Sequence, residues 1–135
     1  MDFHDQGFAS INLNGADLSE VNLIDSKLKS ATLELANLYG ASLMGTDLTE
    51  ANLHYTALKY ANLENAILKN SFMEYAYLDR ADLQRADLTN ASLRYANLEC
   101  VDLRGTIMNG TNLYETFHLP ITKEEAMDRG ALFFV

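Results

Sequence analysis

The chain has 135 residues, of which 48% are hydrophobic and 21% charged, a length and composition typical of one globular domain. Its 19 acidic and 10 basic residues give a net charge of −9, which disfavours direct nucleic-acid binding because phosphate contacts need clustered Lys and Arg. No apolar run of about 18 residues is present, so we expect no membrane partner. The single cysteine, Cys100, and an acidic amino terminus without a signal-like apolar stretch favour a cytoplasmic location.

Residues 1–10 form a lead-in to the regular part of the chain. Phe3 and Phe8 keep the five-residue spacing that follows, but Gln6 lies where later blocks have a small residue. We therefore expect a partial cap over the beginning of the repeat, because an uncovered end would expose backbone edges and apolar side chains. Alternatively, Phe8 belongs to a degenerate opening block.

Residues 11–115 form 21 consecutive blocks of five residues. The third residue of each block is Leu, except where Met73 and Met108 replace it. The first residue is Ala in 12 blocks and Ser, Thr, Val or Ile in the other 9, and the second is Asn or Asp in 12 blocks. At about 100° per residue, successive leucines would lie roughly 140° apart around a helix, so the period excludes an amphipathic helix.

A continuous strand does not fit this period either, because side chains alternate along a strand and an odd spacing sends successive leucines to opposite faces. The pattern fits if each block is a short extended piece followed by a bend. The first and third residues then point inward and the second points outward. Such units stack on copies of themselves, so the sequence predicts a solenoid.

The blocks resemble the A-(D/N)-L-X-X signature of the pentapeptide-repeat family, without interruption over 105 of the 135 residues. The resemblance implies an all-β solenoid, namely a right-handed quadrilateral β-helix with four blocks per coil and about five coils. The chain is similar to the small uninterrupted members found in cyanobacteria and other bacteria.

With four blocks per coil, residues twenty apart lie in one column along the axis. The predicted structural core includes one such buried column, formed by Leu13, Leu33, Leu53, Met73, Leu93 and Leu113. This core is filled by side chains, so we expect no cofactor inside it.

His54 is expected between Glu34 and Glu74 on adjacent rungs, about 4.8 Å apart, which raises the question of a metal or acid–base site. One histidine and two surface carboxylates lack the enclosure and ligand number of a usual zinc site, so we expect a solvated charge ladder and no bound metal. No histidine, cysteine, serine or lysine lies in a recognised catalytic motif, so we also expect no enzymatic activity.

An aromatic surface is the candidate partner site. Tyr55, Tyr75 and Tyr95 are each the fifth residue of a block and are twenty apart, so they are expected to stack along one edge, with Tyr77 on the adjoining side. Stacked aromatic side chains can simply stabilise neighbouring rungs. They can also form a recognition patch, because tyrosine is enriched at interface hot spots.

Residues 116–135 are expected to form a carboxyl-terminal cap. Pro120, the only proline, ends the repeat, and Thr122 with Glu125 forms the capping box of a short helix that Gly130 ends. We expect the apolar tail 131–135 to cover the last coil of a monomer. Several members of the family dimerise through carboxyl-terminal elements, so a dimer through 131–135 is the alternative.

Two functions are therefore considered. The first is a non-catalytic structural or protein-interaction module whose protein partner the sequence does not identify. The second, implied by the resemblance, is a mimic of duplex DNA that inhibits or protects DNA gyrase. The net charge agrees with the second function, but no loop interrupts the repeat and basic residues break every acidic column, so we rank it second.

Overall fold

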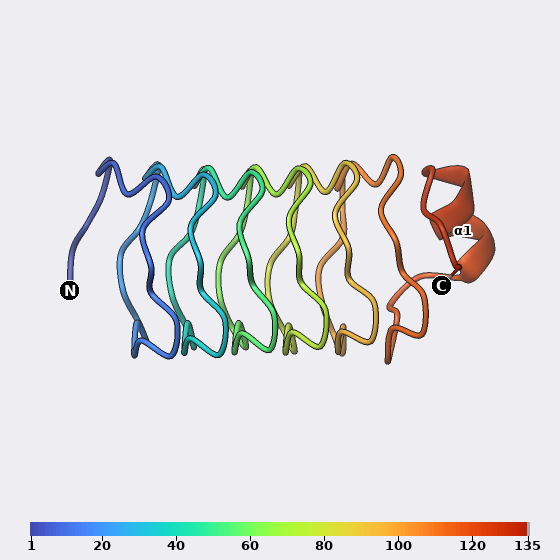
Figure 1. The fold of residues 1–135 in the computed structure, drawn as a ribbon. Helices are drawn as coiled ribbons and strands as arrows, with labels where there is room; N and C mark the ends of the chain where they lie inside the picture. The colour runs from blue at the N-terminus through green and yellow to red at the C-terminus, as the bar shows by residue number, and fades with distance from the viewer. Residues whose placement is uncertain (135) are drawn as a thin grey trace.

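The computed structural model describes residues 1–134, in which the chain winds in successive coils about one axis and ends in a short helix (Figure 1). Residues twenty apart pair in parallel, beginning with Asp2 and Asn22 and continuing to Asn97 and Phe117. Twenty residues are four blocks of five, so each coil contains four blocks. The fold is a solenoid, as the period of five predicts.

Backbone hydrogen bonds run along the axis and join each block to the blocks above and below it. In a typical block the N–H of Leu33 donates to the carbonyl of Asn52 at 2.7 Å, and the N–H of Thr32 donates to the carbonyl of Ile11 at 2.9 Å. The N–H of Leu35 reaches the carbonyl of His54 at 3.0 Å. These bonds satisfy the buried backbone groups without a flat sheet.

Each block ends in a tight corner. The N–H of Ala36 donates to the carbonyl of Leu33 at 3.0 Å, and the residue between them at the fifth position, Leu35, has a φ of 60°. A turn with positive φ only at its third residue is type II. The fifth residue has positive φ in every block from Asp5 to Glu115, so the corners are uniform.

The pairing consists of isolated parallel bridges, and residues 1–134 contain no continuous strand. The solenoid is therefore all-β only in the sense that single residues of successive coils form parallel bridges. Two of the five residues in each block form the corner, so the extended part of the block is too short for a regular strand.

The interior is a column of apolar side chains from the first and third positions. Leu33, Leu53 and Met73 are 0% exposed, and Leu93 and Leu113 are 1% exposed. Leu13 is only partly buried, in contrast to the expectation for the column, because it lies in the first coil and no further coil covers it.

Threonine at an inward position is also accommodated. The Oγ1 of Thr46 donates to the carbonyl of Leu23 at 2.7 Å, and the Oγ1 of Thr56 donates to that of Leu33 at 2.9 Å. Each of these hydroxyls therefore binds a carbonyl of the preceding coil, and burying it leaves no unpaired donor.

Residues 1–10, expected as a lead-in, have the same geometry as the repeat. Asp5 and Ser10 have positive φ like the other fifth residues, and Gly7 bridges to Lys27. Phe3 and Phe8 occupy central positions, and their ring centroids are 5.5 Å apart. The coil geometry therefore begins ahead of residue 11.

The carboxyl-terminal segment contains helix α1, Lys123–Asp128, which covers the end of the coil (Figure 1). The Oγ1 of Thr122 accepts the N–H of Glu125 at 3.1 Å, but the Glu125 carboxylate binds Arg129 instead of completing the capping box. After α1, Gly130 has a φ of 88°, and Ala131 N–H donates to the Ala126 carbonyl at 3.0 Å, which is a Schellman ending.

The tail then returns to the coil in register. Leu132 bridges to Asn112, twenty residues earlier, and exchanges hydrogen bonds with Leu113 and Thr111 at 2.7 Å. Ala126 of α1 is 0% exposed over the coil end. Val135, the last residue of the tail considered above, lies outside the described residues. No helix within residues 1–134 has the length and apolar character needed to cross a membrane.

Candidate protein-interaction surface

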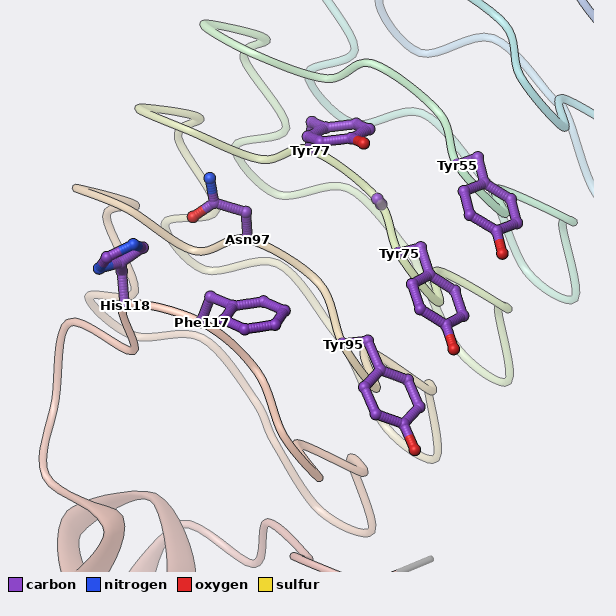
Figure 2. A pocket seen from close by; sticks show the side chains of 8 residues that line it. Tyr55, Tyr75, Tyr77, Tyr95, Asn97, Phe117 and His118 are labelled. Atoms are coloured by element: carbon purple, nitrogen blue, oxygen red, sulfur yellow. The ribbon is translucent and has the colours of Figure 1, made fainter.

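The corner formed by fifth residues brings three tyrosines together. The ring centroids of Tyr55 and Tyr75 are 4.9 Å apart with an interplanar angle of 7°, and those of Tyr75 and Tyr95 are 4.9 Å apart at 11°. Figure 2 shows the three rings in a row with their hydroxyl groups pointing the same way. We call this row the tyrosine ladder. The register of twenty residues produces it, because equivalent corners stack directly.

The ladder continues with a change of geometry at its carboxyl-terminal end. Tyr114 meets Tyr95 edge-on, at 5.9 Å and 85°. The Arg94 guanidinium lies 5.4 Å from the Tyr95 ring centroid and 5.8 Å from that of Tyr114, which adds cation–π contacts. Arg94 and Tyr114 therefore hold this end of the ladder.

The adjoining side of the coil carries a second column, formed by second residues of successive blocks. Along the axis it reads Ala57, Tyr77, Asn97 and Phe117, and consecutive members are paired by backbone bridges. Tyr77 is 53% exposed and Phe117 is 57% exposed. Small and large side chains therefore alternate from Ala57 onward, whereas the two earlier members of the column, Asp17 and Asn37, are both short.

The ladder and this column enclose a shallow hollow of about 270 Å³. It is lined by Tyr55, Tyr75, Ala76, Tyr77, Tyr95, Asn97, Phe117 and His118 (Figure 2). All four tyrosines predicted from the sequence line this one hollow, so the structure brings the candidate residues together.

Sequence reasoning missed four lining residues, Ala76, Asn97, Phe117 and His118. Phe117 lies two residues beyond the predicted end of the repeat, yet it bridges to Asn97 and its N–H donates to the Ala96 carbonyl at 2.9 Å. The signal was present, because Phe117 is forty residues after Tyr77 and hence in the same column. The leucine pattern ends at Glu115, whereas the backbone register continues for two more residues.

His54 and Glu74 form a close pair outside this hollow. The Nε2 of His54 lies 2.6 Å from the Glu74 carboxylate, and the imidazole also contacts Phe72 with ring centroids 6.3 Å apart. Within residues 1–134, Glu34 forms no ion pair with His54. No group of three or more His, Cys, Asp or Glu side chains with metal-binding geometry occurs within residues 1–134.

The comparison with family models decides the classification. The model for pentapeptide repeats in eight copies matches residues 8–38, 33–70, 46–85 and 73–110. The chain is a pentapeptide-repeat protein. The resemblance in the sequence is thereby confirmed. No curated protein matches this pentapeptide-repeat protein significantly over its sequence.

Solved structures agree with this assignment. Rfr23 from the cyanobacterium Cyanothece is 27% identical, with a TM-score of 0.58 over 98% of this chain and 91% of that one. QnrB1, a plasmid-mediated fluoroquinolone resistance protein, is 17% identical, with a TM-score of 0.79 over 95% of this chain and 67% of that one. At 17% identity, the similarity to QnrB1 shows a shared fold only.

HetL from the cyanobacterium Nostoc, a pentapeptide-repeat protein involved in heterocyst differentiation regulation, is 29% identical over 85% of this chain, with a TM-score of 0.47. The pentapeptide-repeat protein described here spans 60% of the length of HetL.

Proposed function

We propose that this pentapeptide-repeat protein is a non-catalytic protein-interaction module that binds its partner through the hollow beside the tyrosine ladder. The supporting observation is that four tyrosines and Phe117 gather around one hollow on the outside of the coil. Elsewhere the interior is filled, with the central leucines at 0–4% exposure from Leu23 to Leu113. A filled interior offers no deep site for a small substrate.

The exposure of the aromatic side chains also favours recognition. Tyr55, Tyr75 and Tyr77 are 43%, 41% and 53% exposed, although a purely structural role would be served by rings packed more deeply. Contiguous exposed aromatic side chains are typical of interaction sites, where tyrosine supplies large contact area at a small cost in entropy.

The test is capture of a partner from an extract of the source organism on the immobilised protein. Tyr77→Ala and Tyr75→Ala should each weaken capture by about 1–2 kcal/mol if the rings are anchors. Phe72→Ala is the matched control, because Phe72 is an equally exposed outward ring, 50% exposed, on a different side of the coil. Partner capture that is lost in Phe72→Ala but retained in both tyrosine variants would contradict the proposal.

A second candidate function is DNA mimicry directed at gyrase, supported by the net charge of −9. We rank it second because basic side chains neutralise the acidic columns: Arg104 binds Asp102 at 2.6 Å and Lys69 binds Asp87 at 3.1 Å. Inhibition of gyrase supercoiling that weakens with salt would favour this function, because surface charge is screened over about 10 Å at 0.1 M salt.

The decisive variants for DNA mimicry are Asp82→Asn and Asp102→Asn. Each removes a charge but keeps the side-chain oxygen that accepts the N–H of Gln84 or Arg104. Loss of gyrase inhibition in these variants, with inhibition unchanged in Tyr77→Ala, would reverse our ranking of the two functions.

We further propose that the coil is right-handed and that the protein acts as a monomer in the cytoplasm, with the carboxyl-terminal segment as a cap. The return of Leu132 into register with Asn112 supports the capping role, because the tail occupies the place of a further rung. Sedimentation equilibrium would test the monomer against a dimer formed through 131–135.

A further inference from the structure

We propose that the hollow beside the tyrosine ladder binds a polyproline-II segment of a partner protein, with apolar side chains three residues apart and a Lys or Arg after them. This inference rests on the proposed function and specifies the chemistry of its partner. It is carried by the alternation of side-chain size along one column and by the charges that border it.

The alternation creates two low positions on either side of Tyr77. Ala57 and Asn97 are the small members of this part of the column, and Tyr77 and Phe117 are the large ones. Asn97 lies between Tyr77 and Phe117 in the hollow (Figure 2), and Ala57 precedes Tyr77 by one rung just outside it. The rungs repeat at 4.9 Å, as the ladder rings show, so the two low positions are roughly 10 Å apart. Side chains that enter both positions must have about this spacing.

Polyproline II meets this requirement. It has three residues per turn and rises about 3.1 Å per residue, so side chains three apart repeat at roughly 9.3 Å along one face. An extended β-strand repeats on one face at about 6.6 Å and would fall out of register within one step. Aromatic-lined grooves are also the usual docking sites of polyproline-II segments.

The ladder leaves no face of the Tyr75 ring free for a flat-ring ligand. Tyr75 is covered on both faces by Tyr55 and Tyr95 at 4.9 Å, so it presents its edge and hydroxyl group outward. A nucleobase or a sugar ring needs a free aromatic face to stack on. Hydroxyl groups in a row instead offer hydrogen bonds to peptide carbonyls, which a polyproline-II backbone leaves unpaired.

Carboxylates outnumber guanidinium groups around the Asn97 position. Asp79 and Glu99 lie on one side, where Arg80 turns toward the Tyr60 ring, and Glu115 lies at the ladder corner on the other, near Arg94. Within residues 1–134 none of these three carboxylates forms an ion pair, and Asp79 accepts only a hydrogen bond from Asn97 Nδ2 at 2.8 Å. The Glu115 carboxylate also raises the pKa of Tyr114, which Arg94 opposes. Carboxylates that no ion pair neutralises favour a basic residue of the partner.

The experiment uses a fluorescein-labelled peptide with the sequence Pro-Leu-Pro-Pro-Leu-Pro-Arg-Arg and the whole protein, followed by fluorescence anisotropy. We expect saturable binding that weakens as salt is raised, because the flanking charges are exposed. A second peptide with Glu in place of both arginines should bind at least about tenfold more weakly.

Three variants locate the site. Asn97→Tyr should abolish peptide binding, because a ring at this position fills the gap between Tyr77 and Phe117. It also removes the acceptor of the Glu99 N–H, so its melting temperature should fall slightly, and an unchanged circular dichroism spectrum is needed to show that the coil is intact. Tyr77→Ala should weaken binding about tenfold, because the Tyr77 ring separates the low positions at Ala57 and Asn97 and contacts the side chains in both. Glu99→Gln should weaken binding several-fold at low salt. Phe72→Ala and Glu50→Gln, on other sides of the coil, are the controls and should bind like the wild type.

The inference is overturned if the basic peptide does not bind saturably, if the acidic peptide binds equally well, or if Asn97→Tyr keeps the wild-type affinity. Its failure is distinguishable from failure of the proposed function. If the tyrosine variants still weaken partner capture from extract while the peptide does not bind, the hollow is a protein-binding site of different chemistry. Equal binding of an acidic peptide or an oligonucleotide would likewise exclude a basic polyproline-II partner.

Discussion

An Asn or Asp precedes the central residue in 12 of the 21 blocks, and each of these side chains has the same role. Its Oδ1 accepts the backbone N–H two residues later, for example Glu64 N–H on Asn62 at 2.9 Å and His54 N–H on Asn52 at 3.1 Å. This Asx turn starts the corner. The preference for Asn and Asp is therefore a requirement of the corner and does not indicate a ligand site.

Asn62→Ala should lower the free energy of unfolding by about 1 kcal/mol, because it leaves the Glu64 N–H without its side-chain acceptor. Urea denaturation followed by circular dichroism measures this loss. Ser42→Ala is the matched control: Ser42 precedes Asn62 by one rung in the same column, and no side-chain hydrogen bond is formed by it within residues 1–134. Equal losses in both variants would show that the turn bond contributes nothing.

Three of these aspartates make the stability depend on pH. Hydrogen bonds from the hydroxyl and N–H of Ser19 lower the pKa of Asp17, and those from Arg104 lower the pKa of Asp102. Burial raises the pKa of Asp87, but the Thr89 hydroxyl, the Thr89 N–H and Lys69 outweigh it, so the net shift is downward.

A lowered pKa in the folded state stabilises the protein above the ordinary value of 3.8, and this contribution is lost as the pH falls through the lowered pKa. The melting temperature should therefore decrease from about pH 5 downward. The triple variant Asp17→Asn, Asp87→Asn and Asp102→Asn keeps the Oδ1 acceptors but cannot titrate there. The melting temperature of this variant should decrease less steeply as the pH falls. A dependence of melting temperature on pH as steep as that of the wild type would contradict this account.

At the scale of the element, the structural unit is the column of equivalent positions in successive coils. Leu13 and Leu53 occupy the same column, but Leu53 is 0% exposed whereas Leu13 is only partly buried. The neighbouring coils on both sides fix how far a side chain is buried. Position along the axis therefore determines how much an identical residue stabilises the fold.

Leu53→Ala should lower the free energy of unfolding by about 2–5 kcal/mol, because truncation leaves a cavity between filled rungs. Leu13→Ala should lower it by clearly less, since part of its side chain is already exposed. Guanidinium denaturation of both variants gives the comparison. Losses of equal size would mean that the amino-terminal coil is as well packed as the middle of the rod.

The five-residue block and its bend could be predicted from the sequence, but the hydrogen bonds of the corner and the extent of each column could not. The five-residue spacing of leucines required a bend in every block, and the resemblance to the family supplied four blocks per coil. The role of Asn62 was not predictable, because Asn before Leu indicates an Asx turn only when the corner geometry is known. The alternation of Ala57, Tyr77, Asn97 and Phe117 was missed because Phe117 lies beyond the last leucine block.

At the scale of the whole molecule, the coil ends differ. Helix α1 covers the carboxyl-terminal end with Ala126, and the Arg129 guanidinium donates to the Leu103 carbonyl at 2.9 Å. At the other end, Phe3, Phe8, Ile11, Leu13 and Leu18 are only partly buried. A solenoid needs its terminal rungs covered, because each rung otherwise exposes one apolar face.

Ala126→Asp should lower the melting temperature and increase light scattering on heating, because it places an unpaired charge against the last rung and displaces α1. Differential scanning fluorimetry with static light scattering measures both effects. Met127→Asp is the control, since Met127 is on the same helix but 56% exposed. If the two variants melted alike, α1 would not stabilise the coil end.

The pairing of residues twenty apart also determines how the chain can change in length. Loss of a stretch of twenty residues would shorten the rod by one coil and leave every column continuous. Loss of a single block between Tyr75 and Tyr95 would rotate all later residues by one side of the coil. Tyr95 would then no longer follow Tyr75, and the residues that line the hollow would be divided between two sides although each block kept its leucine. Natural variants that preserve the hollow but differ in length within it should therefore differ by whole coils, whereas the loss of a single block there should preserve the core but not the hollow.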